Sequence, residues 1–222
     1  MGSDNLFHKR KVRRAASLRR TAARRDSHDT VLIVCEGEKT EPNYFRELRD
    51  DLRLSHFNIE ITGSSQGSAP INVVNHALQY HKDYDKTFCV FDQDQHSSYQ
   101  KALDKIKGKE KSRKHSITAV TSVPCFEFWL LLHFRLTTKQ FVAASGSPCD
   151  QVVRELKNFL PTYNKGSRGI YFETSKRLPQ ALENAERVAS HCAAAGTEHP
   201  STKIHLLVNY LLKLHSAKGL TG

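Results

Sequence analysis

The first part of the chain alternates short apolar runs with longer amphipathic segments. The runs at 31–35 and 87–91 are continuous and rich in β-branched, aromatic and cysteine side chains, which is typical of strands buried on both faces of a parallel sheet. The same patterns predict further strands at 57–62 and 117–121, and helices at 41–53, 70–81, 97–107 and 125–134. Strands that alternate with helices indicate an α/β fold with a mostly parallel sheet.

This alternation stops after Arg135. The remaining pattern predicts helices at 137–143, 148–159, 176–195 and 201–217. We therefore expect three parts: a flexible basic arm (1–28), an α/β domain (29–135) and a C-terminal helical appendage (136–222).

The positive charge of the chain is concentrated in two places. The whole chain carries 34 Lys and Arg against 23 Asp and Glu, a net charge of +11, and residues 1–28 alone hold nine of those cations and two Asp. Clusters of this kind favour a polyphosphate partner. The alternative is that residues 1–28 are a solubilising tail and that residues 104–114 form a solvated loop. The candidate nucleic-acid contacts are Arg13, Arg14, Arg19, Arg20, Arg24, Arg25, Lys105, Lys107, Lys109, Lys111, Arg113 and Lys114.

Several classes of protein are disfavoured by the same sequence. It contains no apolar run long enough for a membrane span, and no apolar segment follows the N-terminal charges as in a secretory signal. The five cysteines are an odd number without a C-x-x-C pair. We therefore expect a cytoplasmic protein without a disulfide framework or a cysteine-rich zinc site.

Acidic residues follow two of the predicted strands. Glu36 comes directly after the strand at 31–35, and Asp92 and Asp94 come after the strand at 87–91. We expect these carboxylates to converge, because parallel strands end at one edge and residues i and i+2 of an extended segment point the same way. Oxygen ligands of this kind favour Mg²⁺ or Mn²⁺. Taken alone, the Asp pair could instead be a helix cap or a turn.

Other polar residues could complete such a site. Lys39, one turn after Glu36, is placed to contact a phosphate group. Glu127 lies in an apolar run, where it is either a first-turn acid bonded to backbone N–H groups or a metal ligand or base. Tyr163 and Lys165 lie in a polar stretch that could reach the site, and the sequence alone assigns neither a role.

Glu36-Gly37 together with Asp92-x-Asp94 matches the signature of the Toprim fold. Four longer strings are more specific: CEGEKTEPNYF at 35–45, VFDQD at 90–94, PCFEFWLLLHF at 124–134 and PSTKIHLLV at 200–208. These strings resemble the RloB family, and the resemblance runs from about Arg10 to about Leu212.

The resemblance implies a Toprim-like protein of prokaryotic anti-phage defence, related to restriction and abortive-infection systems and controlled by an ATPase partner. Its expected activity is Mg²⁺- or Mn²⁺-dependent endonucleolytic cleavage of RNA, with tRNA as one candidate, or of DNA. The alternative is a non-catalytic subunit that binds nucleic acid or docks on the ATPase. The oligomeric state stays open.

One position departs from the Toprim pattern. Many Toprim nucleases have a second acid four residues after the glutamate, whereas position 40 here is Thr and the next acid is Glu41. Glu41 is either a shifted metal ligand or a first-turn helix acid. The expected metal ligands are thus Glu36, Glu41, Asp92 and Asp94. The expected catalytic residues are Glu36, Lys39, Asp92, Asp94 and Glu127.

Overall fold

The computed structural model describes most of the chain. The described residues are 29–64, 67, 69–93, 97–107, 109, 115–142 and 146–219. The basic arm predicted over 1–28, with its six candidate arginines, lies outside them, and so do Asp94, Lys111, Arg113 and Lys114.

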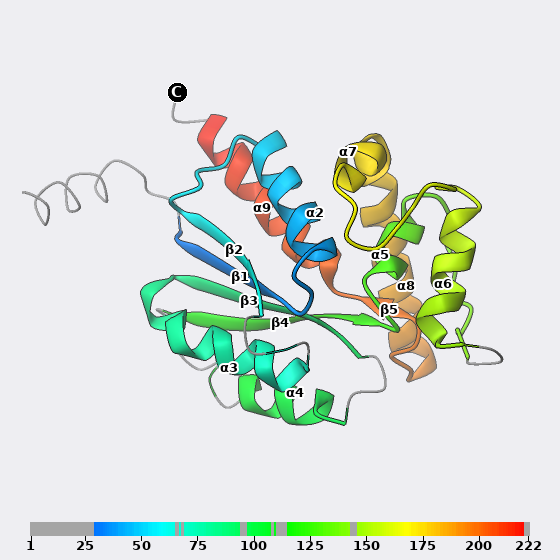
Figure 1. Cartoon of the computed structure of the whole chain (residues 1–222), viewed down its shortest axis with the longest axis horizontal. Helices are drawn as coiled ribbons and strands as arrows, with labels where there is room; N and C mark the ends of the chain where they lie inside the picture. Colours follow the sequence, from blue (N-terminus) through cyan, green and yellow to red (C-terminus); the bar gives the residue numbers. More distant parts are fainter. Residues whose placement is uncertain are drawn as a thin grey trace, which may run out of the picture.

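Five strands form one sheet in the order β2-β1-β3-β4-β5 (Figure 1). The first four strands are parallel, and β5 pairs antiparallel with β4. Because Cys35 lies opposite Gly63 and Val90 in the register, the carboxyl ends of three strands meet at one edge. The strands are β1 (Val31–Cys35), β2 (Ile59–Gly63), β3 (Lys86–Asp92), β4 (Ser116–Val123) and β5 (Ser201–Thr202).

Helices cover both faces of this sheet (Figure 1). On one face, Leu32 and Val34 of β1 pack in a core with α3 (Pro70–Tyr80) and α4 (Tyr99–Lys107). On the other face, the alternate β1 side chains pack in a core with α2 (Thr40–Asp51) and α9 (Ile204–Gly219). A continuous apolar run is therefore needed in β1, because both of its faces are buried.

The remaining helices extend the second core. They are α5 (Glu127–Leu132), α6 (Pro148–Lys157), α7 (Ile170–Thr174) and α8 (Leu178–Ala195), with 3-10 turns at His81–Asp83 and Ser175–Arg177. Trp129 of α5 is fully buried there, and Nδ2 of Asn184 on α8 donates to the carbonyl of Leu132 at 2.8 Å. The C-terminal part thus adds β5 to the sheet and shares one core with the α/β part.

The predicted α/β class, with a mostly parallel sheet and C-terminal helices, is confirmed. The helix predicted over 137–143 is wrong across residues 137–142, which are not helical. There the hydroxyl of Thr137 accepts the N–H of Lys139 at 3.3 Å, a local bond that competes with a helix, and Phe141 packs against Phe128. In the part of the chain that the structure describes, no helix is long and apolar enough to cross a membrane.

The Asn184 contact gives a test of how firmly α8 is joined to α5. Asn184→Ala leaves the buried Leu132 carbonyl without its donor, so we expect unfolding free energy to fall by about 1 to 3 kcal/mol in urea denaturation. The neighbouring Glu183→Ala is the control, because that side chain is 71% exposed and should change stability by no more than about 0.5 kcal/mol. Equal stability of the two variants would contradict this packing.

Candidate active site

Glu36 and Asp92 meet at the carboxyl edge of the sheet, where β1 and β3 are neighbours. The N–H of Glu36 donates to the carbonyl of Val90 at 2.9 Å, which extends the strand pairing by one residue. The N–H of Asp92 then donates to Oε2 of Glu36 at 2.8 Å. The convergence of these two acids, expected from the strand pattern, is therefore present, while Asp94 lies outside the described residues.

Glu41 reaches the same place from the first turn of α2. Its side chain is buried and accepts hydrogen bonds from its own N–H and that of Gly37. A Cβ on Gly37 would lie 2.6 Å from Oε2 of Glu41, so a glycine is needed for this close approach. Glu41 therefore binds backbone groups at the helix start and also lines the acidic pocket described below. Its role as a ligand stays a prediction.

Glu127 approaches from the start of α5 and is only 2% exposed. The hydroxyl of Tyr163 donates to its Oε1 at 3.0 Å, and Nζ of Lys165 lies 3.4 Å from the same oxygen. The sulfur of Cys149 lies 3.4 Å from Oε2. All three partners are side chains of the C-terminal part. The sequence had offered backbone N–H groups as the partners of Glu127 if it is a first-turn helix acid.

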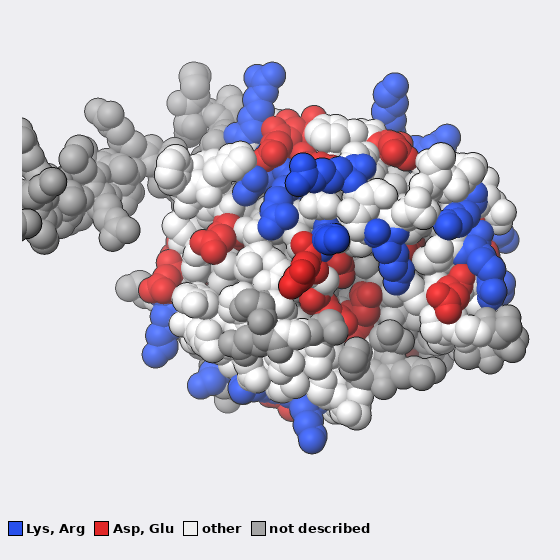
Figure 2. All heavy atoms as spheres, viewed as in Figure 1, with Lys and Arg blue, Asp and Glu red and all other residues white. Residues whose placement is uncertain are grey.

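Together these residues line a cavity of about 220 Å³, here called the acidic pocket: Glu36, Gly37, Thr40, Glu41, Asp92, Phe126, Glu127 and Lys165. Figure 2 shows acidic side chains gathered in the middle of this face, with Lys and Arg side chains around them. The cavity holds polar groups of both signs, as expected of a site for an ion or a phosphate group.

The acidic pocket raises the proton affinity of two of the carboxylates that line it, Asp92 and Glu41. Burial first, and then the charges of Glu41, Glu127 and Glu36, raise the pKa of Asp92 well above its ordinary value, against a lowering hydrogen bond from the backbone of Phe126. Burial and the charge of Glu127 also raise the pKa of Glu41, while Lys165 opposes the rise. A divalent cation would offset this repulsion, and oxygen donors of this kind fit Mg²⁺ or Mn²⁺.

Two lysines lie at or beside the acidic pocket, and the role of Lys39 as a phosphate contact stays a prediction. Lys39 is exposed and lies beside the acidic pocket, in a neighbouring hollow against Gly166. Lys165 lines the acidic pocket itself, and its place is fixed through the next residue: the N–H of Gly166 donates to Thr40 at 2.8 Å, and its carbonyl accepts from Asn43 at 3.3 Å. The only sequence signal for Lys165 was the polar stretch that contains it.

The basic segment at 105–114, which holds the second group of candidate nucleic-acid contacts, is only partly described. Lys105 and Lys107 lie on α4, which covers the face of the sheet opposite α2, and Lys109 follows that helix (Figure 1). All three side chains are exposed, and Nζ of Lys105 donates to Asn75 at 2.6 Å. A role of this segment in binding nucleic acid stays a prediction.

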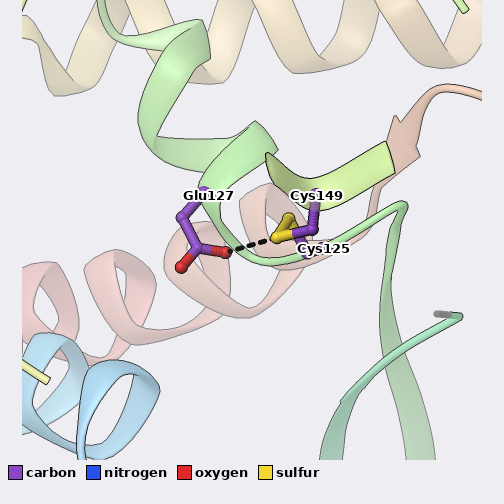
Figure 3. Close-up of side chains that lie close together, drawn as sticks. All are labelled: Cys125, Glu127 and Cys149. Carbon is purple, nitrogen blue, oxygen red and sulfur yellow. Dashed lines mark hydrogen bonds between the residues drawn. A yellow bond between two sulfur atoms is a disulfide. The ribbon is translucent and has the colours of Figure 1, made fainter. Parts of the chain in front are cut away.

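The cysteines require a correction. The cysteine pattern predicted no disulfide framework, yet Cys125 and Cys149 are joined by a disulfide although 24 positions separate them (Figure 3). The fold brings the turn between β4 and α5 against the start of α6, a contact that residue spacing could not reveal. Both sulfurs and a carboxylate oxygen of Glu127 lie within 4.8 Å of one another. Cys35, Cys89 and Cys192 are free and buried.

The raised pKa of Glu41 predicts a pH-dependent gain from Glu41→Gln. A carboxyl whose pKa is higher in the folded state stabilises the fold at low pH and loses that contribution as pH rises through the folded pKa. Removing the charge should therefore raise the metal-free Tm at pH 7, and the gain should shrink on acidification. We expect about 2 to 4 °C, the shift given by one kcal/mol in a chain of this size.

Differential scanning calorimetry from pH 4 to pH 8 checks this expectation. Glu38→Gln is the matched control, because it removes the same charge from an exposed side chain near Glu41. A Glu41→Gln gain that is absent at pH 7, or that is as large at low pH as at neutral pH, would show that the buried charge is not the cause.

Comparison with known proteins agrees with the strings singled out in the sequence. No curated protein and no solved structure matches the chain at a significant level. A family model described as RloB-like protein matches residues 31–211, which include the whole acidic pocket. The chain therefore belongs to the RloB family.

Proposed function

We propose that this chain is a Toprim-type, metal-dependent endonuclease of an anti-phage defence system. The observation that carries the proposal is the acidic pocket, in which Glu36, Glu41 and Asp92 gather at the carboxyl edge of a parallel sheet. Ligands of open α/β sheets bind at this edge, and pocket residues with perturbed pKa values are candidates for chemistry. The RloB family of the chain is consistent with a role in defence.

The donor set fits a hard divalent cation. Glu36, Glu41 and Asp92 would hold Mg²⁺ or Mn²⁺, with Asp94 as a further ligand expected from the sequence. When bound, such an ion supplies a water of lowered pKa and neutralises charge on a phosphoryl group.

Among the described residues, Lys165 is the one best placed to contact the phosphate. It lines the acidic pocket while its side chain remains 59% exposed, so its ammonium group can reach a substrate that enters from solvent. Glu127 orients it through the ion pair at 3.4 Å. Lys39, in the adjoining hollow, would add positive charge further along the phosphate backbone.

Tyr163 acts as a hydrogen-bond donor in this scheme. Burial and the neighbouring Glu127 raise its pKa, so its hydroxyl keeps its proton and donates to Oε1 of Glu127. Glu127 therefore works as a positioning residue that holds Lys165 at the pocket wall. This scheme uses water as the nucleophile and forms no covalent intermediate with a tyrosine.

The net charge of +11 supports nucleic acid as the substrate, because cations that neutralise phosphates release bound counterions. RNA, including tRNA, and DNA are both candidates. Contacts of this kind give affinity without sequence information, so we assign the choice of cleavage site to the pocket and to an ATPase encoded alongside.

Conservative substitutions in the acidic pocket test the chemistry. Glu36→Gln and Asp92→Asn keep the shape of the site but remove its charge, so we expect metal-dependent cleavage to fall by about 100- to 1000-fold. The assay incubates tRNA and plasmid DNA separately with Mn²⁺, Mg²⁺ or chelator, with the ATPase present and absent. Glu38→Gln, which removes an exposed charge on the same loop, should keep full activity.

If the unaltered chain binds these nucleic acids but cleaves neither under any of these conditions, the nuclease proposal is wrong. The chain would then be a binding or docking subunit. Cleavage that persists in both pocket variants would contradict the assigned site.

Deleting residues 1–28 separates binding from chemistry. The arm holds nine cations, so its loss should weaken binding of tRNA or DNA and flatten the plot of log K against log salt by about 0.7 to 0.9 for each lost phosphate contact. The acidic pocket lies outside the arm, so saturating substrate should restore most of the cleavage rate. An unchanged salt slope, measured by fluorescence anisotropy, would show that the arm does not bind the phosphate backbone.

A further inference from the structure

We infer that Cys125 and Cys149 form a reversible redox pair that controls the wall of the acidic pocket. The proposed function does not use these cysteines, yet their disulfide lies directly behind two pocket residues, Glu127 and Lys165. Its effect on cleavage rests on the proposed function. Its effects on thiol content, stability and metal affinity can be measured without it.

The sulfur of Cys149 contacts both members of the ion pair at the pocket wall, Lys165 and Glu127. It lies 3.4 Å from Nζ of Lys165 and 3.4 Å from Oε2 of Glu127. Figure 3 shows the Glu127 carboxylate turned toward the joined sulfurs. The bond state of Cys149 therefore decides what these two charged groups meet: a disulfide sulfur without a hydrogen, or a thiol that can donate to Glu127.

The disulfide also ties a segment that carries pocket residues to the start of α6. Cys125 is followed directly by two pocket residues, Phe126 and Glu127. The backbone of Phe126 binds the carboxylate of Asp92. Cys149 lies in the first turn of α6. Two separate thiols cannot stay at covalent distance, so on this inference reduction lets these segments move apart and loosens the contacts that position Asp92 and Glu127.

The ammonium group of Lys165 and the carboxylate of Glu127 lie equally far from the sulfur of Cys149, and we write the course of reduction in which this sulfur leaves. A thiolate of a dithiol reductant attacks the sulfur of Cys125, the S–S bond breaks, and the Cys149 sulfur leaves with the electron pair beside the ammonium group. That thiolate then takes a proton from water. The second thiol of the reductant displaces Cys125 as a thiol, which leaves a protein dithiol and an oxidised reductant.

A hydroperoxide would reverse the change. The Cys149 thiolate attacks the peroxide oxygen, which gives a sulfenic acid and an alcohol or water after protonation. The Cys125 thiol then attacks that sulfur and expels water as the disulfide forms. In total, two thiols and one hydroperoxide give one disulfide, one alcohol (or a water) and one water. The chemical class of the signal is thus a hydroperoxide or a disulfide oxidant.

The test begins with the full chain prepared with hydrogen peroxide or with dithiothreitol. Alkylation after denaturation should label three cysteines in the oxidised protein and all five in the reduced protein. Reduction should lower Tm by about 5 to 10 °C, because it opens a covalent loop. It should also weaken Mn²⁺ binding by about 10-fold, at the low end of the effect of losing the hydrogen bonds that orient metal ligands.

Variants assign these changes to the pair. Cys149→Ala and Cys125→Ala should make Tm and Mn²⁺ affinity independent of the redox buffer. Cys192→Ser is the matched control: its thiol is free and donates to the carbonyl of Pro200, so this variant should respond as the unaltered chain does. If Cys149→Ala does not fold, the unaltered chain titrated across a dithiothreitol redox buffer supplies the same three readings.

Three results would overturn the inference. They are a pair that resists reduction in the folded protein, a Tm and Mn²⁺ affinity that are equal in both states, and a reduced protein that binds one Zn²⁺ at the two sulfurs and does not reoxidise. Redox-dependent Tm and Mn²⁺ affinity without cleavage would support the redox pair while contradicting the nuclease. Cleavage that is equal in both states would contradict only the control by redox.

Discussion

The fold holds together, in the acidic pocket, carboxylates that repel one another. Parallel pairing of β1 and β3 places Glu36 beside Asp92, and the first turn of α2 adds Glu41. Burial and this repulsion together raise the pKa values of Asp92 and Glu41. Such an arrangement lowers stability unless a cation offsets the charge, so its presence at a sheet edge points to function more than to folding.

The C-terminal part of the chain supplies the balancing groups. Lys165 and Tyr163 both contact Glu127, and Gly166 binds the start of α2 through Thr40 and Asn43. The acidic edge of the sheet and the helices after it are therefore parts of one site. The disulfide of Cys125 and Cys149 joins the same two parts of the chain, beside Glu127.

The sequence predicted what local pattern and strand order determine. Buried strands read as continuous apolar runs, and acids that follow neighbouring parallel strands share an edge, so the proximity of Glu36 and Asp92 was predicted from the sequence. Lys165 was not assigned and Cys149 was not paired, because their positions depend on how a segment far along the chain folds back. Short elements such as β5 and α7 were missed because two to five residues carry no periodicity.

The most direct test of this account is the anomalous diffraction of Mn²⁺ in crystals of the oxidised chain. We predict a peak in direct contact with the carboxylate oxygens of Glu36, Glu41 and Asp92 that disappears in Glu36→Gln. An acidic pocket without metal at saturating Mn²⁺, or a peak that leaves these three carboxylates uncoordinated, would contradict the central claim.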